Sequence, residues 1–157
     1  MLSHEDIARR IPHRGTMCLL ERVVAWSPDA IQCEAHSHRD ADNPLRAHGR
    51  LGIACGIEYA AQAMATHGSL VAPSGSASNG VPRAGYLASV RAVEWHRGRL
   101  DDVAGPLLVN ATRLMGDGNH IVYSFEVSSQ DGPLISGRAT VVLDAALVAA
   151  VIPGSAA

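Results

Sequence analysis

Apolar runs and alternating segments predict that the chain begins with a β-hairpin. Residues 17–26 are mostly apolar, and from Ile31 to His36 apolar and polar side chains alternate, as they do in a half-buried strand. The turn signal of residues 27–29, Ser-Pro-Asp, joins the two runs. Ahead of them, a Ser-x-x-Asp capping pattern predicts a short helix over residues 5–10.

The segment 51–70 predicts the one long helix of the chain. Apolar residues recur there at helical spacing, at Ile53, Ile57, Ala60 and Met64. Other small and apolar residues continue nearly all round this helix, which predicts burial on all sides. Because one sheet cannot cover such a surface, we also expect two of these units to pair as a dimer.

Beyond a Gly/Ser/Pro-rich loop at residues 73–83, the chain is predicted to form four strands. They cover residues 86–95, 106–115, 121–128 and 134–143. Strong turn signals join the last three, so we expect a meander. Only one long helix is available to cover the apolar face of this antiparallel sheet, so the sheet must curl around it. We therefore predict an α+β fold of the hot-dog type, as a single domain over residues 1–157.

Composition and charge narrow the function classes. The chain is 47% apolar and 18% charged, as in globular proteins, and its net charge of -2 argues against nucleic-acid binding. No segment has the roughly 18 uninterrupted apolar residues of a membrane helix, and the polar N-terminus is not a signal sequence. Cys18, Cys33 and Cys55 lack CxxC spacing and fall on apolar faces. We therefore expect a cytoplasmic protein with buried free thiols and no membrane association.

Glu58 is the carboxylate that stands out in the predicted helix. It is the only acidic residue between Leu51 and Ala65, and a buried carboxylate is costly unless it is paired or protonated. Burial favours the neutral carboxyl group, which suits general acid or base catalysis near neutral pH. The alternative is a structural Glu58 bonded to main chain or to an arginine such as Arg14 or Arg91.

Gly52 and Gly56 bring bare main chain into the first turns of the same predicted helix. Unpaired N–H groups and the positive end of the helix dipole favour an oxyanion there. Gly52 precedes Glu58 by about 9 Å along a helix that rises about 1.5 Å per residue, a distance suited to a thioester carbonyl and its β-hydroxyl. The alternative is that the two glycines serve close packing.

Two stretches resemble the FabZ/FabA-type dehydratases that act on 3-hydroxyacyl chains carried by acyl carrier protein (ACP). Residues 11–23, IPHRGTMCLLERV, resemble the family's opening "(L/I)PHR…(L)L(D/E)RV". Residues 58–63, EYAAQA, resemble the "E(A/Y)xAQ" of its central helix. The similarity extends over about residues 11–143, and the wording GIEYAAQA is most similar to the ApeP-like branch linked to aryl-polyene pigments.

This resemblance implies a hydro-lyase that dehydrates a 3-hydroxyacyl thioester on ACP or CoA, in fatty-acid or polyene biosynthesis. Glu58 would be the acid/base carboxylate, and the amides around Gly52 and Gly56 the oxyanion site. In the family a histidine takes the proton next to the thioester carbonyl, and histidine and glutamate come from different subunits. No metal or other cofactor is implied, and the partner would be a second copy or a related hot-dog subunit in a dimer or higher oligomer.

The chain departs from the family pattern at that histidine. The family's "HxxxxPxxPG" places it fourteen residues before the glutamate, where this chain has Pro44. His48, ten residues before Glu58, is our candidate base, because imidazole titrates near neutral pH. His13 lies in the matched PHR motif, where the family residue is structural. Two alternatives remain open: an inactive or helper subunit of a dehydratase heterodimer, and a hot-dog thioesterase in which Glu58 activates water.

Other histidines and arginines carry weaker signals. Residues 36–42, His-Ser-His-Arg-Asp-Ala-Asp, resemble part of a zinc motif, but we expect a solvated surface and no metal. The remaining histidines near element ends are expected to be solvated as well: His4, His67, His96 and His120. Because carrier proteins are acidic, five loop arginines are a candidate docking patch: Arg46, Arg50, Arg83, Arg97 and Arg99.

Overall fold

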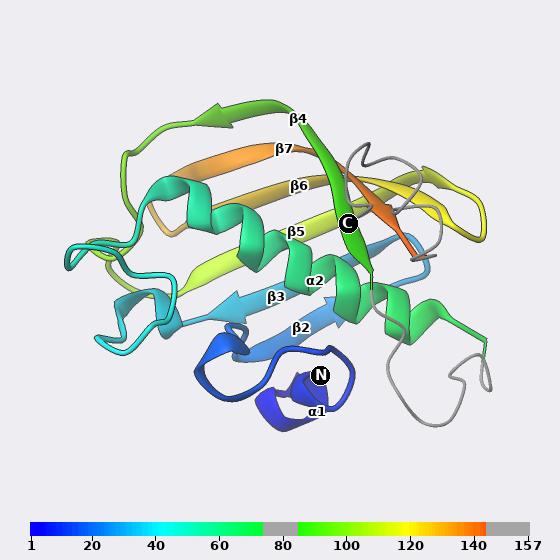
Figure 1. Ribbon diagram of the computed structural model, residues 1–157, viewed down its shortest axis with the longest axis horizontal. Helices are drawn as coiled ribbons and strands as arrows, with labels where there is room; N and C mark the ends of the chain where they lie inside the picture. Colours follow the sequence, from blue (N-terminus) through cyan, green and yellow to red (C-terminus); the bar gives the residue numbers. More distant parts are fainter. Residues whose placement is uncertain (74–84, 144–157) are drawn as a thin grey trace, which may run out of the picture.

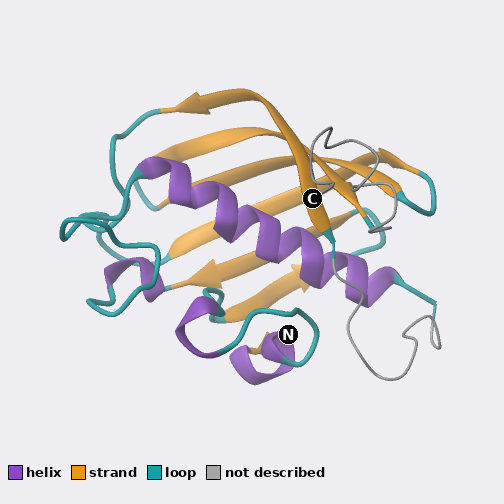
Figure 2. Cartoon of the chain, viewed as in Figure 1, coloured by secondary structure: helices purple, strands orange, loops and turns teal. Residues whose placement is uncertain are grey.

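In the computed structural model, a seven-stranded antiparallel sheet curls around the long helix α2 (Gly56–Val71), which crosses its concave face (Figure 1). The structure describes residues 1–73 and 85–143. Within these residues α2 is the only long helix, and every strand pairing is antiparallel (Figure 2). This is the hot-dog architecture that the pattern of elements predicts.

The strands and short helices have the following bounds. The strands are β1 (Leu2–Ser3), β2 (Arg22–Trp26), β3 (Ala30–Ala35), β4 (Tyr86–Trp95), β5 (Leu107–Gly116), β6 (His120–Ser129) and β7 (Gly132–Val142). The short helices are α1 (His4–Ala8) and the 3-10 helices η1 (Gly15–Met17), η2 (Ser37–Arg39) and η3 (Ile53–Cys55).

The strand order is β1-β2-β3-β5-β6-β7-β4, so the predicted meander of four strands is wrong. β5, β6 and β7 are joined by hairpins as expected, but β4 pairs with β7 at the edge of the sheet, and β5 pairs with β3. The reason is the connection between β4 and β5. It covers residues 96–106, which is too long for a tight hairpin and allows the chain to cross to β3.

The alternation in the first hairpin sets the register of the sheet. Ile31, Cys33 and Ala35 are buried toward α2, and Ile31 and Cys33 lie opposite the buried Ala111 and Val109 of β5. The predicted first strand is shorter than expected, because residues 18–21 are not in β2 and residues 15–17 form η1. The capping box of α1 forms as predicted, with Ser3 and Asp6 bonded reciprocally.

The long helix is shorter at its start than predicted, and it is not buried on all sides. Residues 51–53 run beside residues 98–100: Leu100 N–H donates to Leu51 O, and Ile53 N–H donates to Gly98 O. These contacts give the segment an extended course until η3 and α2 begin. The buried residues of α2 face the sheet, whereas Ile57, Glu58, Ala61 and Ala65 on the other side are only half-buried in the single chain.

No helix among the described residues is long and apolar enough to cross a membrane.

Candidate active site

Glu58 lies in the first turn of α2, on the side of the helix that the sheet does not cover completely. Its side chain is 31% exposed, so the prediction of a fully buried carboxylate is wrong for the single chain. The sheet packs against the other side of α2, where Ala60 and Ala63 are fully buried. Glu58 is therefore accessible to a ligand and partly sheltered from water.

One oxygen of Glu58 is held by two side chains. Gln62 Nε2 donates a hydrogen bond to Glu58 Oε1 at 3.1 Å, and His13 Nε2 lies 2.9 Å from the same oxygen. Neither Arg14 nor Arg91 pairs with Glu58: Arg14 donates to main-chain carbonyls of its own segment instead. Within the described residues, Oε2 has no hydrogen-bond partner.

Gln62 links this carboxylate to the N-terminal segment. It is fully buried, its Oε1 accepts from Leu19 N–H at 2.9 Å, and its Nε2 donates to Met17 O at 2.8 Å as well as to Glu58. The EYAAQ spacing explains the contact of Gln62 with Glu58, because residues four apart lie on the same side of a helix. The contacts with Met17 and Leu19 span more than forty residues of sequence.

His13 is a neighbour of Glu58 to which the resemblance to the family gave only a structural role. It lies within the PHR motif, and its side chain is 26% exposed. Its Nε2 faces Glu58, while its Nδ1 is buried and lacks a hydrogen-bond partner among the described residues. The co-occurrence of the PHR and EYAAQ motifs was the available signal, but it gives no contact without the fold.

His48 is not brought into contact with Glu58 within the chain. It is exposed, has a φ of 53°, and occupies a turn closed by the bridge between Ala47 and Arg50. Among the described residues no side-chain hydrogen bond or ion pair holds its imidazole. Its role as base stays a prediction, and within one chain the imidazole beside Glu58 is that of His13.

Gly52 and Gly56 differ in their surroundings. Gly52 is exposed and pairs with Arg99 in an isolated bridge, and its carbonyl accepts from Cys55 N–H. Gly56 is buried: a Cβ at this position would lie 2.6 Å from Ile135 Cγ2, so close packing requires glycine. The Gly56 N–H already donates within η3 to Ile53 O and Ala54 O. The oxyanion role of both glycines stays a prediction, and Gly56 has a packing role in addition.

A buried polar cluster fastens the loop after β3 to α2. Ser37 Oγ donates to Leu19 O at 2.7 Å, so the Tyr59 hydroxyl donates to Ser37 Oγ at 2.8 Å. Asn43 Nδ2 donates to Tyr59 Oη at 3.1 Å. Burial raises the pKa of Tyr59, which keeps it a neutral donor. The cluster holds the loop that leads to His48 against the first turns of α2.

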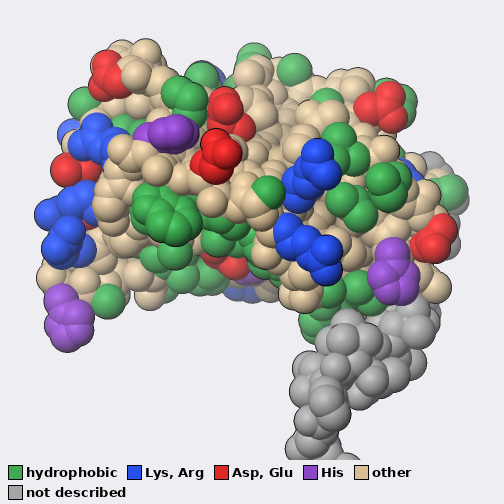
Figure 3. All heavy atoms as spheres, turned by 90° about the horizontal axis from the view of Figure 1, so that it is seen from above, with side chains coloured by type: hydrophobic (Ala, Val, Ile, Leu, Met, Phe, Trp, Pro, Cys, Tyr) green, Lys and Arg blue, Asp and Glu red, His purple; other side chains and the backbone are tan. Residues whose placement is uncertain are grey.

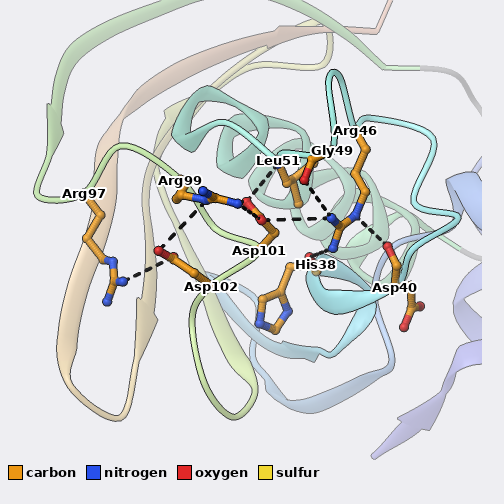
Figure 4. A network of polar contacts seen from close by, with 9 residues as sticks. All are labelled: His38, Asp40, Arg46, Gly49, Leu51, Arg97, Arg99, Asp101 and Asp102. Carbon is orange, nitrogen blue, oxygen red and sulfur yellow. Dashed lines mark hydrogen bonds and ion pairs between the residues drawn. The ribbon is translucent and has the colours of Figure 1, made fainter.

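An ion-pair network centred on Asp101 lies at the end of the molecule where α2 begins (Figure 4). Asp101 accepts from Leu51 N–H at 2.9 Å and from Arg99, and Arg46 lies 4.0 Å away. The hydrogen bonds from Arg99 and Leu51 hold the pKa of Asp101 well below its usual range. The network fixes the entry to the helix by joining residues 46–51 to the loop between β4 and β5.

This network also uses three of the five arginines of the predicted docking patch. Arg46 and Arg99 contact Asp101, and Arg97 donates to Asp102 at 3.2 Å. The nearby carboxylates therefore neutralise much of their charge. Arg50 is exposed, and Arg83 lies outside the described residues.

The other histidines have separate structural roles. His67 is fully buried, so its predicted solvation is wrong: Nδ1 accepts from the Tyr123 hydroxyl and Nε2 donates to Ser27 O, both at 2.9 Å. His38 is also buried and contacts Val103 O, whereas His36 is exposed and contacts Glu34. Burial lowers the pKa of His38 and His67. In the described part of the chain no three His, Cys, Asp or Glu residues gather as metal ligands.

The three cysteines are free thiols. Cys18 and Cys33 are buried as predicted, and Cys55 is half-buried. Burial raises the pKa of Cys33 to about 12, and it also raises the pKa of Cys18 and Cys55. Because a thiolate is the reactive form, these thiols are poor nucleophiles. The chemistry of the site therefore depends on the carboxylate and not on a thiol.

The fold is shared with solved dehydratase and thioesterase structures. A chain of the dehydratase heterocomplex ApeI:P from Xenorhabdus doucetiae is 21% identical, with a TM-score of 0.78 over 94% of this chain and 97% of that one. A thioesterase from Haemophilus influenzae is 15% identical, with a TM-score of 0.63 over 90% of each chain. The PaaI protein of the phenylacetic acid degradation operon of E. coli is 13% identical, with a TM-score of 0.56 over 88% of each.

No curated protein sequence matches the chain. The family model described as ApeP dehydratase matches residues 5–151, which include the PHR motif, α2 and every strand from β2 to β7. This match confirms the dehydratase resemblance of the two motifs and the expected hydro-lyase class. The chain therefore belongs to the ApeP-like family of dehydratases.

Proposed function

We propose that this chain provides Glu58 as the acid/base carboxylate in the dehydration of a 3-hydroxyacyl thioester. The observation that carries the proposal is the arrangement of that carboxyl group. Oε1 is held by Gln62 and faced by His13, while Oε2 has no partner among the described residues and the side chain is 31% exposed. A carboxyl group with one anchored and one open oxygen is suited to exchange a proton with a bound substrate.

The reaction removes a proton from the carbon next to the thioester carbonyl and releases the β-hydroxyl as water. The electron pair of the broken C–H bond forms the new C=C bond as the C–O bond breaks. Glu58 gives its proton to the departing hydroxyl. A second group must accept the proton from carbon, because a single carboxyl group cannot be protonated for one step and ionised for the other at the same moment.

We propose that this second group is an imidazole supplied across a subunit interface. His13 faces Glu58 through Nε2 and has a buried Nδ1, so it lacks a ring nitrogen free for the substrate carbon. His48 is exposed and makes no contact with Glu58 in its own chain. The two sources are His48 of a second copy and a histidine of a related hot-dog subunit. The heterocomplex formed by the relative from Xenorhabdus doucetiae supports the second source.

The acyl group is proposed to arrive as a thioester of ACP or CoA. Exposed Arg50 lies in the loop that leads to the helix, at the end of the molecule where Glu58 is located. A phosphorylated carrier arm or an acidic carrier protein would be attracted to a guanidinium there.

The test is a direct assay of water loss with a 3-hydroxyacyl thioester. The chain is assayed alone and together with a related hot-dog subunit that carries the family's histidine, and Glu58→Gln and His48→Ala are assayed beside the wild type. We expect Glu58→Gln to lower kcat by at least about a hundredfold, which is the usual contribution of general acid–base catalysis. Undiminished water loss by Glu58→Gln in every combination would refute the role of Glu58.

His48→Ala separates the two sources of the second group. If a second copy supplies the base, the substitution abolishes the activity of the chain alone. If a related subunit supplies it, the chain alone is inactive, and the mixture retains activity with His48→Ala.

A second candidate function is hydrolysis of the thioester. The structural neighbours that are thioesterases support it, because water activated by Glu58 could attack the same carbonyl. A plain acyl thioester without the β-hydroxyl distinguishes the two reactions. Thiol release from that substrate, abolished by Glu58→Gln, would establish the thioesterase.

A further inference from the structure

We propose that Gln62 and His13 are positioning residues that hold Oε1 of Glu58 and leave Oε2 as the oxygen that exchanges the proton. The inference rests on the proposed acid/base role of Glu58 and specifies which atom performs it. It is drawn from three side chains of one chain, His13 from the N-terminal segment and Glu58 and Gln62 from α2.

The orientation of the Gln62 amide is fixed by its partners. Leu19 N–H is a donor, so the amide oxygen must face it; Met17 O is an acceptor, so the amide nitrogen must face that side. The two hydrogens on Nε2 then go to Met17 O and Glu58 Oε1. A flipped amide would set its oxygen against a carbonyl and a carboxylate inside a fully buried site. Gln62 is therefore a permanent donor to Oε1.

The surroundings of His13 determine where its proton lies. At 2.9 Å from a carboxylate oxygen, Nε2 is attracted when it carries hydrogen and repelled when it presents a lone pair. A hydrogen on Nδ1 would be a buried donor without a partner in the described residues, which is unfavourable. Both contributions favour the neutral tautomer with its proton on Nε2.

Two donors on one oxygen make the carboxyl group asymmetric. A proton placed on Oε1 would have to displace the Gln62 hydrogen or meet the His13 hydrogen, whereas Oε2 has no such donor. When Glu58 is protonated, its proton is therefore on Oε2, on the side open to a ligand. The same contacts restrict rotation of the carboxyl group, so Oε2 keeps one direction through the proton transfer.

The arrangement is tested first by NMR, independently of activity. Long-range ¹H–¹⁵N spectra report the tautomer of each histidine, and the His13→Gln variant assigns the signals of His13. In the neutral imidazole of His13 we expect a protonated Nε2 and an unprotonated Nδ1, and we expect shifts of both nitrogens and of the Gln62 amide in Glu58→Gln. His67, bonded to Tyr123 and Ser27, is the internal control and should not change. A proton on His13 Nδ1, or signals unaffected by Glu58→Gln, would overturn the inference.

Kinetics with matched variants provides the second test. Glutamine places a donor nitrogen near the position of Nε2, whereas asparagine is too short to reach Oε1. We expect His13→Asn to lower kcat about tenfold, the loss of one hydrogen bond to a charged group, with an unchanged KM and a similar Tm. His13→Gln should keep kcat within about threefold of the wild type.

The outcomes separate the two proposals. Equal kcat values for His13→Asn and the wild type, or equal losses in His13→Asn and His13→Gln, would refute the positioning role. A wild type that is inert on 3-hydroxyacyl thioesters, even with a partner subunit, would refute the dehydratase proposal. The expected NMR signals in that same protein would still support the inference that Gln62 and His13 hold Oε1 of Glu58.

Discussion

At the scale of single residues, the carboxyl group of Glu58 is held by Gln62 from its own helix and is faced by His13 from the N-terminal segment. Glu58 could be predicted as a candidate site residue because a lone carboxylate in an apolar helix is unusual. Its contact with Gln62 follows from their spacing of four residues. The contact of His13 with Glu58 joins positions 45 residues apart, which no local pattern encodes. The burial of His67 could not be predicted for the same reason, because its partner Tyr123 belongs to a distant strand.

Tyr59 should be important for stability because its hydroxyl completes a buried polar cluster. Tyr59→Phe removes the donor to Ser37 and leaves the Asn43 amide with one partner fewer. We expect a loss of about 1–3 kcal/mol in the free energy of unfolding, measured by urea denaturation. Tyr86→Phe is the matched control, since Tyr86 is 42% exposed, and it should change stability by less than about 0.5 kcal/mol. Equal effects of the two substitutions would contradict this assignment.

Asp101 should make the stability of the protein depend on pH at the acid end. Because the pKa of Asp101 is lowered in the folded state, its contribution is complete above the ordinary value of 3.8 and is lost as the pH falls below it. We expect Asp101→Asn to lower Tm by a few degrees at pH 7, with a smaller difference from the wild type below about pH 4. Asp131→Asn, in the exposed turn before β7, is the control and should follow the wild type. A constant difference at all pH values would show that charge is not the cause.

At the level of elements, the strands β2 to β7 and the long helix could be predicted, but β1 could not, and most predicted ends differ from the observed ones. β4 has the predicted bounds, since the apolar run of Tyr86–Trp95 is followed by polar residues. The start of α2 was misplaced because residues 51–53 have helical composition but bond to residues 98–100. Those pairings, and the carboxylate of Asp101 on Leu51 N–H, replace the bonds of a first helical turn. Tertiary contacts thus override local propensity there.

The two glycines of α2 give opposite predictions for the same substitution. Gly56→Ala places a methyl group 2.6 Å from Ile135 Cγ2, so we expect destabilisation by about 1–3 kcal/mol. Gly68→Ala meets nothing within 4 Å, and because alanine favours the helix it should stabilise the protein by about 0.5–1 kcal/mol. Thermal and urea unfolding of both variants would check the signs. A tolerated Gly56→Ala would mean that the close approach of α2 to β7 is not required.

Across the whole molecule, the described part of the sheet has two edge strands, the two-residue β1 and the ten-residue β4. Three large apolar side chains are exposed on β4: Tyr86, Leu87 and Trp95. Figure 3 views the molecule from this side and shows hydrophobic groups among charged ones. Sequence reasoning predicted pairing of subunits from the helix alone. It did not identify the β4 edge, because it did not predict that β4 pairs with β7 and that β5 pairs with β3.

Trp95 and Trp26 allow this edge to be tested in one protein. An exposed edge strand with apolar side chains is a site for association, and Trp95 is 63% exposed. We expect Trp95→Glu to shift the protein, or its complex with a partner subunit, toward monomer in light scattering. Trp26→Glu is the control, because Trp26 is 46% exposed on β2, away from this edge. An unchanged mass for Trp95→Glu, or an equal shift in Trp26→Glu, would place the interface elsewhere.

The bonds that Gln62 makes with Met17 and Leu19 have a consequence for how the protein can be altered. The first nineteen residues also contain β1 and four buried core side chains: Ile7, Ile11, Cys18 and Leu19. The segment that holds the carboxyl group of Glu58 through His13 and Gln62 is thus the same segment that closes this side of the hydrophobic core. Local unfolding of the N-terminus would therefore be expected to lower turnover and stability together, and neither could be changed there without the other.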